Sequence, residues 1–276
     1  MGEPPMAKDR SADGATWDHT THADFYAYYA NESQSPVTLQ RFERVQAAVL
    51  RVAAQTGMAS QLAVADIGCG AGTQCQLWAA LGHRVTGLDV NEPLIRLARE
   101  RAEAKALSIH FDVGSATDLP WPDASMDVCL LPELLEHVAD WRSCLNQASR
   151  VLRPGGLLYL STTNVLCPVQ QEFTLPFYSW YPGPVKRYCE RLAVTTRPRI
   201  ANYARYPAVN WFSFYGLRGY LRPLGFRCYD RFDLVDLSDK STIATFIVQT
   251  LRRVPALRFF GHVATHGTAL IAVKSS

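Results

Sequence analysis

The sequence lacks several features that would assign it to particular classes of protein. None of its apolar runs approaches the roughly 18 residues that a membrane-spanning helix needs. Its first residues mix acidic, basic and proline side chains and lack the apolar stretch of a signal peptide. No two of the seven cysteines are spaced as Cys-x-x-Cys, which argues against a zinc knuckle or a redox pair. A net charge of only +3 gives no indication of a nucleic-acid partner.

The remaining composition is that of a globular protein. Hydrophobic residues make up 48% and charged residues 19% of the 276 residues, which predicts one large domain or one domain with an insertion. Several cysteines fall inside apolar patterns, where buried free thiols are common, so we expect a reducing, cytoplasmic location. Residues 1–23 are polar, and we expect a disordered tail there.

The most informative stretch runs from Val64 to Gly72. Its first residues are apolar or small, as a strand buried on both faces requires, and Gly68, Gly70 and Gly72 follow in a turn. A turn without side chains lets the backbone approach a ligand closely at the start of the next helix. The spacing differs from the dinucleotide pattern, which would need a glycine at Thr73. The carboxylate of Asp66 would repel a pyrophosphate, so a ligand with a cationic amino-acid end, such as S-adenosylmethionine, fits better.

A second short strand ends at Asp89, 21 residues after Gly68, where an acidic side chain can accept hydrogen bonds from ribose hydroxyls. Asp-x-Gly-x-Gly-x-Gly followed by a Gly-Leu-Asp strand end resembles the class I S-adenosylmethionine-dependent methyltransferases, over roughly residues 40–163. The resemblance implies a doubly wound, Rossmann-like α/β fold. Its seven-stranded sheet would be mostly parallel, with an antiparallel last strand. The length of the connection after strand five, which the standard fold does not need, predicts an inserted cap.

The rest of the chain predicts repeated strand–helix units, which give a parallel sheet with helices on both faces. We expect the core at 24–163, the cap at 164–210 and the C-terminal part of the core at 211–276. We expect strands at 64–67, 83–89, 108–113, 128–131, 157–161, 226–235 and 268–274, and helices at 36–56, 73–82, 93–106, 133–152, 211–224 and 241–251.

The resemblance also implies a set of cofactor-binding positions. They are Asp66, Gly68, Gly70, Gly72, Asp89, Val90, Ser115, Ala116 and Pro132. The family usually has an aspartate at the position of Ser115, where it holds the adenine amino group. A serine hydroxyl can accept the same hydrogen bond without a charge.

The segment from Glu133 to His137 is similar to the Glu-x-x-Glu-His segment of the ubiquinone-biosynthesis O-methyltransferases and of the small-RNA 2′-O-methyltransferases. His137 is the candidate catalytic base, and a structural histidine is the alternative. By the same resemblance, Glu133, Glu136 and His137 could hold Mg²⁺, Mn²⁺ or Zn²⁺ beside the acceptor hydroxyl. The families supply a further histidine shortly before a tryptophan, and this sequence has Val209 and Asn210 there.

Residues 164–210 form a long connection with eight aromatic residues, six prolines and an excess of four positive charges. A long insertion at a ligand-binding edge is usually functional, so we expect a cap over the acceptor, with a structural buttress as the alternative. Its arginines could meet an acidic group or lipid head groups, which would give a peripheral membrane contact. The candidate substrate residues are Tyr29, Trp180, Tyr181, Arg197, Arg199 and Trp211.

A second segment, 247–260, combines apolar and basic residues. A core-packed helix and loop is the favoured interpretation, and a helix on a membrane surface is the alternative. The predicted function is methyl transfer from S-adenosylmethionine to a small-molecule hydroxyl or carboxyl oxygen. C- or N-methylation and an inactive S-adenosylmethionine-binding module are the alternatives, and the oligomeric state stays open.

Overall fold

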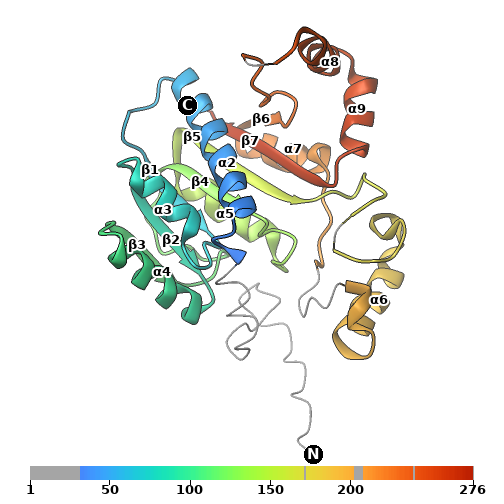
Figure 1. The fold of residues 1–276 in the computed structure, drawn as a ribbon, viewed down its shortest axis with the longest axis horizontal. Coiled ribbons are helices and arrows are strands. Elements are labelled where there is room, and N and C mark those ends of the chain that lie inside the picture. Colours follow the sequence, from blue (N-terminus) through green and yellow to red (C-terminus); the bar gives the residue numbers. More distant parts are fainter. Residues whose placement is uncertain (1–31, 171, 202–207, 239, 276) are drawn as a thin grey trace, which may run out of the picture.

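The computed structural model describes residues 32–170, 172–201, 208–238 and 240–275 (Figure 1). The predicted disordered tail therefore lies outside the described residues. Within them, no helix is both long enough and apolar enough to cross a membrane.

A seven-stranded sheet in the order β3-β2-β1-β4-β5-β7-β6 forms the centre of the molecule. The strands from β1 to β5 pair in parallel, whereas β7 is antiparallel to both β5 and β6. This confirms the predicted doubly wound, mostly parallel fold with an antiparallel last strand. The strands are β1 (Ala63–Ile67), β2 (Arg84–Asp89), β3 (Ile109–Val113), β4 (Met126–Pro132), β5 (Leu152–Thr163), β6 (Phe226–Asp230) and β7 (Gly267–Lys274).

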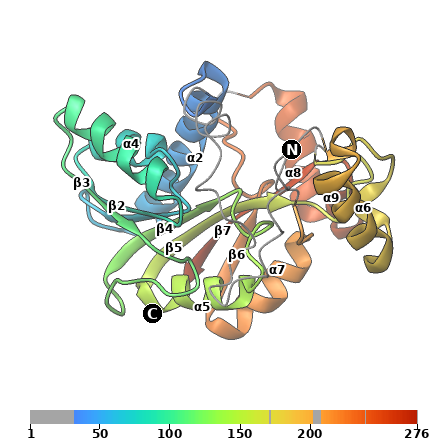
Figure 2. The same ribbon diagram turned by 90° about the horizontal axis from the view of Figure 1, so that it is seen from below.

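Helices cover both faces of the sheet (Figure 2). On one face, α2 (Pro36–Gln55), α3 (Thr73–Ala80) and α4 (Glu92–Ala104) pack on a cluster that includes Val64 of β1. On the other, α5 (Trp141–Val151) and α7 (Phe214–Leu221) pack on a cluster that includes Ala65 and Ile67. Successive residues of β1 thus enter opposite hydrophobic layers, which explains why the whole strand is apolar or small apart from Asp66.

The boundaries of four predicted elements were wrong, for local reasons. The helix expected from Glu133 begins at Trp141, because the Asp140 side chain caps it there. The helix expected from Trp211 begins at Phe214, because the Ser213 side chain caps it and Phe212 accepts a backbone hydrogen bond from Val165. β5 begins at Leu152 and not at 157, because Leu152 already pairs with Met126. β6 ends at Asp230 and not at 235, because the Asp230 side chain accepts hydrogen bonds from two backbone N–H groups of the following turn.

Two insertions extend from the sheet at the same end of the molecule in both views, opposite β3 and α4 (Figures 1 and 2). The first, the predicted cap, contains the 3₁₀ turn η1 (Tyr178–Trp180), α6 (Gly183–Thr195) and η2 (Pro198–Ala201), and has its own small apolar cluster around Phe173 and Tyr178. The second, between β6 and β7, contains α8 (Thr242–Arg253) and α9 (Pro255–Val263). No residue of α8 is buried, so the expectation of a core-packed helix there was wrong.

Candidate functional site

The glycine turn between β1 and α3 has a backbone that only glycine adopts readily. Gly68, Gly70 and Gly72 have φ angles of 79°, 51° and 72°. A Cβ at Gly72 would lie 2.8 Å from the Ala98 Cβ of α4, so this glycine serves helix packing. A Cβ at Gly68 would lie 2.9 Å from Leu134 Cδ1, in the turn that follows β4. The two glycines therefore permit two different close contacts.

Asp66 is buried just before this turn. Its Oδ2 accepts a hydrogen bond from Cys75 Sγ at 3.3 Å, and its Oδ1 has no hydrogen-bond partner among the described residues. Burial raises the pKa of Asp66 to about 7, and the nearby charge of Asp89 also raises it. A buried acceptor without a partner is costly unless a ligand supplies the hydrogen bond.

Asp89 closes the other side of the turn. Its Oδ2 accepts a hydrogen bond from Gly70 N at 2.9 Å, and its Oδ1 accepts one from Asn91 N at 2.9 Å. A carboxylate can accept about four hydrogen bonds, so both oxygens keep capacity for ribose hydroxyls. The adjacent Val90 is exposed. The structure thus brings Asp66, the glycine turn and Asp89 together at the carboxyl edge of the sheet, as the sequence predicts.

The other predicted cofactor residues lie at the same edge. Ser115 follows β3, and its hydroxyl lies 2.8 Å from that of Thr117, while Ala116 is buried beside it. Pro132 ends β4 and pairs with Ser161 of β5. These positions continue the line of strand ends from β2 and β3 to β4, where a ligand of a doubly wound sheet binds.

Two further residues of this site were missed in the sequence. Thr73 and Gln74 open α3 directly after the glycine turn and are buried. Neither Thr73 Oγ1 nor either amide atom of Gln74 has a hydrogen-bond partner among the described residues. Together with Asp66 Oδ1, these atoms fit a ligand that has both donors and acceptors, as the amino and carboxylate groups of S-adenosylmethionine do. Their place in the first turn of α3 was the signal that could have identified them.

The turn after β4 carries the predicted catalytic segment. Glu133 has a positive φ of 50°, is exposed, and accepts a 2.6 Å hydrogen bond from Ser161 Oγ. Glu136 is buried and accepts a 2.8 Å hydrogen bond from Thr162 Oγ1. Burial, together with the charge of Glu133, raises the pKa of Glu136 well above its usual range. Burial therefore favours the protonated form of Glu136, whose carboxyl is directed into the protein.

His137 is half-buried and lies in a turn that is held from both sides. The Asn210 side-chain amide donates hydrogen bonds to the carbonyls of Leu135 and Val138, at 3.0 and 2.7 Å. The backbone N–H groups of Val209 and Asn210 donate to the carbonyl of Glu136, at 3.0 and 3.1 Å. Asn210 thus fixes the backbone of the turn, whereas the sequence suggested that it could supply a ligand oxygen.

The predicted metal ligands do not form a group. Across residues 32–170, 172–201, 208–238 and 240–275, no three His, Cys, Asp or Glu side chains are arranged to hold a metal ion. The physical reason is that Glu133 is turned toward Ser161 and Glu136 toward Thr162. The prediction that Glu133, Glu136 and His137 bind a cation together is not supported.

The predicted substrate residues have unlike environments. Tyr29 lies outside the described residues. Tyr181 and Trp211 both pack against Tyr178 in the cap, with ring centroids 5.4 and 5.5 Å apart. Trp180, Arg197 and Arg199 are exposed, and Trp180 stacks on Phe177. Two of these residues therefore stabilise the cap itself, and the other three are available at its surface.

Comparisons with known proteins match the core of the chain. Residues 65–160 match the family described as a methyltransferase domain. The ubiquinone biosynthesis O-methyltransferase of Maricaulis maris is 40% identical over 134 residues, which are 46% of this chain and 52% of that protein. A malonyl-acyl-carrier protein O-methyltransferase of Serratia marcescens is 36% identical over 97 residues, which are 35% of this chain and 36% of that protein. The chain thus spans about half or less of the length of these curated relatives.

The fold matches over most of the chain. A SAM-dependent methyltransferase of known structure from Aquifex aeolicus superposes with a TM-score of 0.52, covering 89% of this chain and 97% of that one. At 14% sequence identity this similarity shows the fold alone.

Proposed function

We propose that this chain is a class I S-adenosylmethionine-dependent methyltransferase that transfers a methyl group to an oxygen atom of a small-molecule acceptor. The observation that carries the proposal is the contact between the glycine turn and the turn after β4. The turn from Glu133 to His137 lies directly against the glycine turn, through Leu134 and Gly68. An acceptor held by the first turn would therefore face a methyl group held by the second. The matched parts of both curated relatives named above come from O-methyltransferases.

In this proposal the cofactor is held by Asp66, the glycine turn and Asp89, with Thr73 and Gln74 completing its polar contacts. The cofactor supplies an activated methyl group on a sulfonium. Ionised Asp66 favours its cationic amino-acid end, and Asp89 orients the ribose. Ser115, Ala116, Val90 and Pro132 complete the adenine side. The remaining work of the chain is to place the acceptor oxygen in line with the methyl group and to remove its proton.

We assign the removal of that proton to His137. A histidine titrates near neutral pH, and the hydrogen bonds of Asn210 on both sides fix the backbone that carries it. Glu136 is buried and its carboxyl accepts a hydrogen bond from Thr162, so we assign it to positioning the turn and not to proton transfer. A hydroxyl acceptor requires such a base, whereas a carboxylate acceptor is already ionised and does not.

The cap would hold the acceptor in this proposal. Its exposed Trp180 offers an aromatic surface, and exposed Arg197 and Arg199 offer cationic groups for an acidic part of the acceptor. Tyr29, Tyr181 and Trp211 remain candidates for acceptor binding, the last two through their packing on Tyr178.

The test is a methyl-transfer screen against phenols, carboxylic acids and sugars, with wild-type protein, His137→Ala and the control His110→Ala, which changes an exposed residue of β3. With a hydroxyl acceptor, His137→Ala should lower kcat by about 10²- to 10⁴-fold. Calorimetry with S-adenosylhomocysteine should give unchanged affinity for both variants. EDTA should leave the wild-type rate unchanged, since Glu133, Glu136 and His137 are not arranged as a metal-binding group.

Other outcomes would contradict the proposal. A fully active His137→Ala enzyme excludes the base. Transfer only to nitrogen or carbon acceptors would mean that the enzyme catalyses N- or C-methylation and not O-methylation. Absence of S-adenosylhomocysteine binding would mean that the fold has lost its cofactor site. If EDTA abolishes the rate and Mg²⁺, Mn²⁺ or Zn²⁺ restores it, a metal ion activates the acceptor hydroxyl, and the assignment of His137 as the base is wrong.

A further inference from the structure

The helices α8 and α9 expose an unusual amount of apolar surface. Ile243, Phe246 and Phe260 are 73%, 69% and 64% exposed, and Ile247 and Leu257 are also exposed. Residues 243, 246 and 247 share one side of α8, because side chains three and four positions apart lie on the same face of a helix. We call these five side chains the α8–α9 face.

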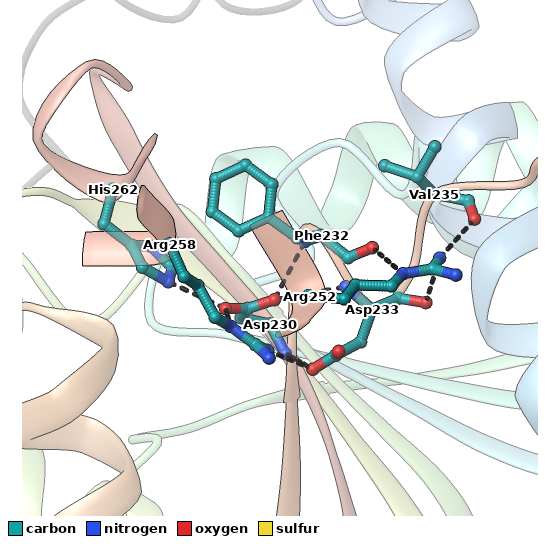
Figure 3. A network of polar contacts seen from close by, with 7 residues as sticks. All are labelled: Asp230, Phe232, Asp233, Val235, Arg252, Arg258 and His262. Atoms are coloured by element: carbon teal, nitrogen blue, oxygen red, sulfur yellow. Dashed lines mark hydrogen bonds and ion pairs between the residues drawn. The ribbon is translucent and has the colours of Figure 1, made fainter. Parts of the chain in front are cut away.

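The opposite side of this helix pair is attached by polar groups (Figure 3). Arg252 donates hydrogen bonds to the backbone carbonyls of Phe232, Asp233 and Val235. Arg258 pairs with Asp230 at 2.6 Å and also with Asp233, and His262 Nε2 lies 2.7 Å from Asp230 Oδ2.

The helix pair also packs closely against the turn after β6. A Cβ at Gly261 would lie 2.6 Å from Phe232 Cζ, so the backbone of α9 packs directly on the turn after β6. The polar contacts and this close approach fix the orientation of both helices. The pair thus has Arg252, Arg258 and His262 turned inward and the α8–α9 face turned outward, whereas a surface helix of an isolated globular protein usually has its apolar side turned inward.

The formal charges within α8 and α9 are all positive, whereas Asp236 and Asp239 precede Lys240 in the sequence, and Asp236 pairs with Arg51 at 3.4 Å. Residues 240–276 contain no aspartate or glutamate. Lys240 and Arg253, at the two ends of α8, are exposed. The two aspartates beneath the pair, Asp230 and Asp233, are held by Arg258. A face that is apolar at its centre and positive at its ends complements a surface that is apolar inside and negative at its boundary.

We propose that the α8–α9 face binds peripherally to a membrane that contains anionic lipid. Its phenylalanine and isoleucine side chains enter the boundary between head groups and acyl chains, and Lys240 and Arg253 contact the head groups. A second copy of the chain is a poorer occupant. A two-fold contact through this face would bring Arg253 and Lys240 toward identical positive groups, with no carboxylate of residues 240–276 to pair with them.

The experiment measures sedimentation of the full chain with vesicles of phosphatidylcholine, alone or mixed with phosphatidylglycerol. Phe246→Ser with Phe260→Ser removes the two largest rings of the face. Val37→Ser with Leu81→Ser is the matched control, since both side chains are exposed on other parts of the molecule. The wild-type protein and the control should bind the anionic vesicles, and the double-ring variant should bind at least tenfold more weakly. All should keep the same circular dichroism spectrum.

A second arm tests the charges. Lys240→Gln and Arg253→Gln should each weaken binding to anionic vesicles about fivefold at low salt, and the difference should shrink as salt is added. Failure of the wild-type protein to bind anionic vesicles would overturn the proposal, as would equal binding by the double-ring variant. A wild-type dimer in light scattering that becomes a monomer in the double-ring variant would instead assign the face to a second copy.

Discussion

Two aspartates at the carboxyl edge of the sheet are both buried, yet they have opposite environments. Asp66 on β1 has one thiol partner, and burial raises its pKa to about 7. For Asp230 on β6, burial alone would also raise the pKa, but hydrogen bonds from His262 and Arg258 bring it to about 2. A strand end that leaves its carboxylate partly unpaired is prepared for a cationic ligand. A strand end whose carboxylate is fully paired fixes a junction between elements.

The strongest test of this comparison is Asp230→Ala. It should lower the free energy of unfolding by about 3 kcal/mol, the lower end for a broken buried pair, since Asp233 still pairs with Arg258. Denaturant unfolding measures the loss. In the matched variant Asp66→Asn the loss should stay within about 1 kcal/mol, because only one weak thiol hydrogen bond is removed. Equal losses in the two variants would remove the distinction.

The second test is pH. The pKa of Asp66 is raised from 3.8 to about 7, so its contribution to stability is full below pH 3.8 and is lost as the pH rises through 7. A cationic cofactor favours the ionised form, so S-adenosylmethionine should bind more tightly as the pH rises from 6 to 8, by up to about tenfold per unit below pH 7. Calorimetry at pH 6, 7 and 8 measures this, with Asp66→Asn as the reference that should show a flat profile.

The contribution of Asp230 has the opposite sign. Its pKa is lowered from 3.8 to about 2, so its stabilisation is present above pH 3.8 and is lost as the pH falls through 2. The two aspartates are therefore separable in one series of unfolding measurements.

A cofactor affinity that does not change between pH 6 and 8 in the wild-type protein would show that Asp66 does not face the cofactor's charge.

The smallest effect is expected for two exposed charges of the cap. Arg197→Ala with Arg199→Ala should raise the acceptor KM by an amount worth less than about 1 kcal/mol, because both side chains are exposed. The affinity for S-adenosylmethionine should not change. Steady-state kinetics with a soluble acceptor measures the effect. A loss of about 2–4 kcal/mol would mean that the acceptor desolvates these guanidinium groups.

The sequence was informative where a site is built from neighbouring residues. Asp66, the glycine turn and Asp89 belong to one strand–turn–strand unit, so local spacing was enough to predict their proximity. Gly72 shows the limit. Its conformation was predictable, but the side chains that fill the space beside it, Ala98 and Phe111, come from α4 and β3.

Orientation was the harder property. The spacing of Glu133, Glu136 and His137 could not reveal that Thr162, on a neighbouring strand, draws Glu136 inward. Likewise, the apolar period of α8 predicted a helix but not which face it turns to the protein. The orientation of α8 is fixed by Arg252, which donates hydrogen bonds to the carbonyl groups of the turn after β6. Hydrophobic periodicity indicates orientation only where the inner surface is apolar.

The position of β7 also affects how the sheet is completed during synthesis. β7 follows β6 in the sequence but lies between β5 and β6 in the sheet. Until Gly267–Lys274 is available, β5 lacks the neighbour that pairs with it in the completed sheet, and its edge is unpaired. Leu158 and Leu160 of β5 are buried in the completed fold. β6 has no strand to join during that interval. A pause in translation between β6 and β7 therefore leaves an open strand edge that can pair with another nascent chain.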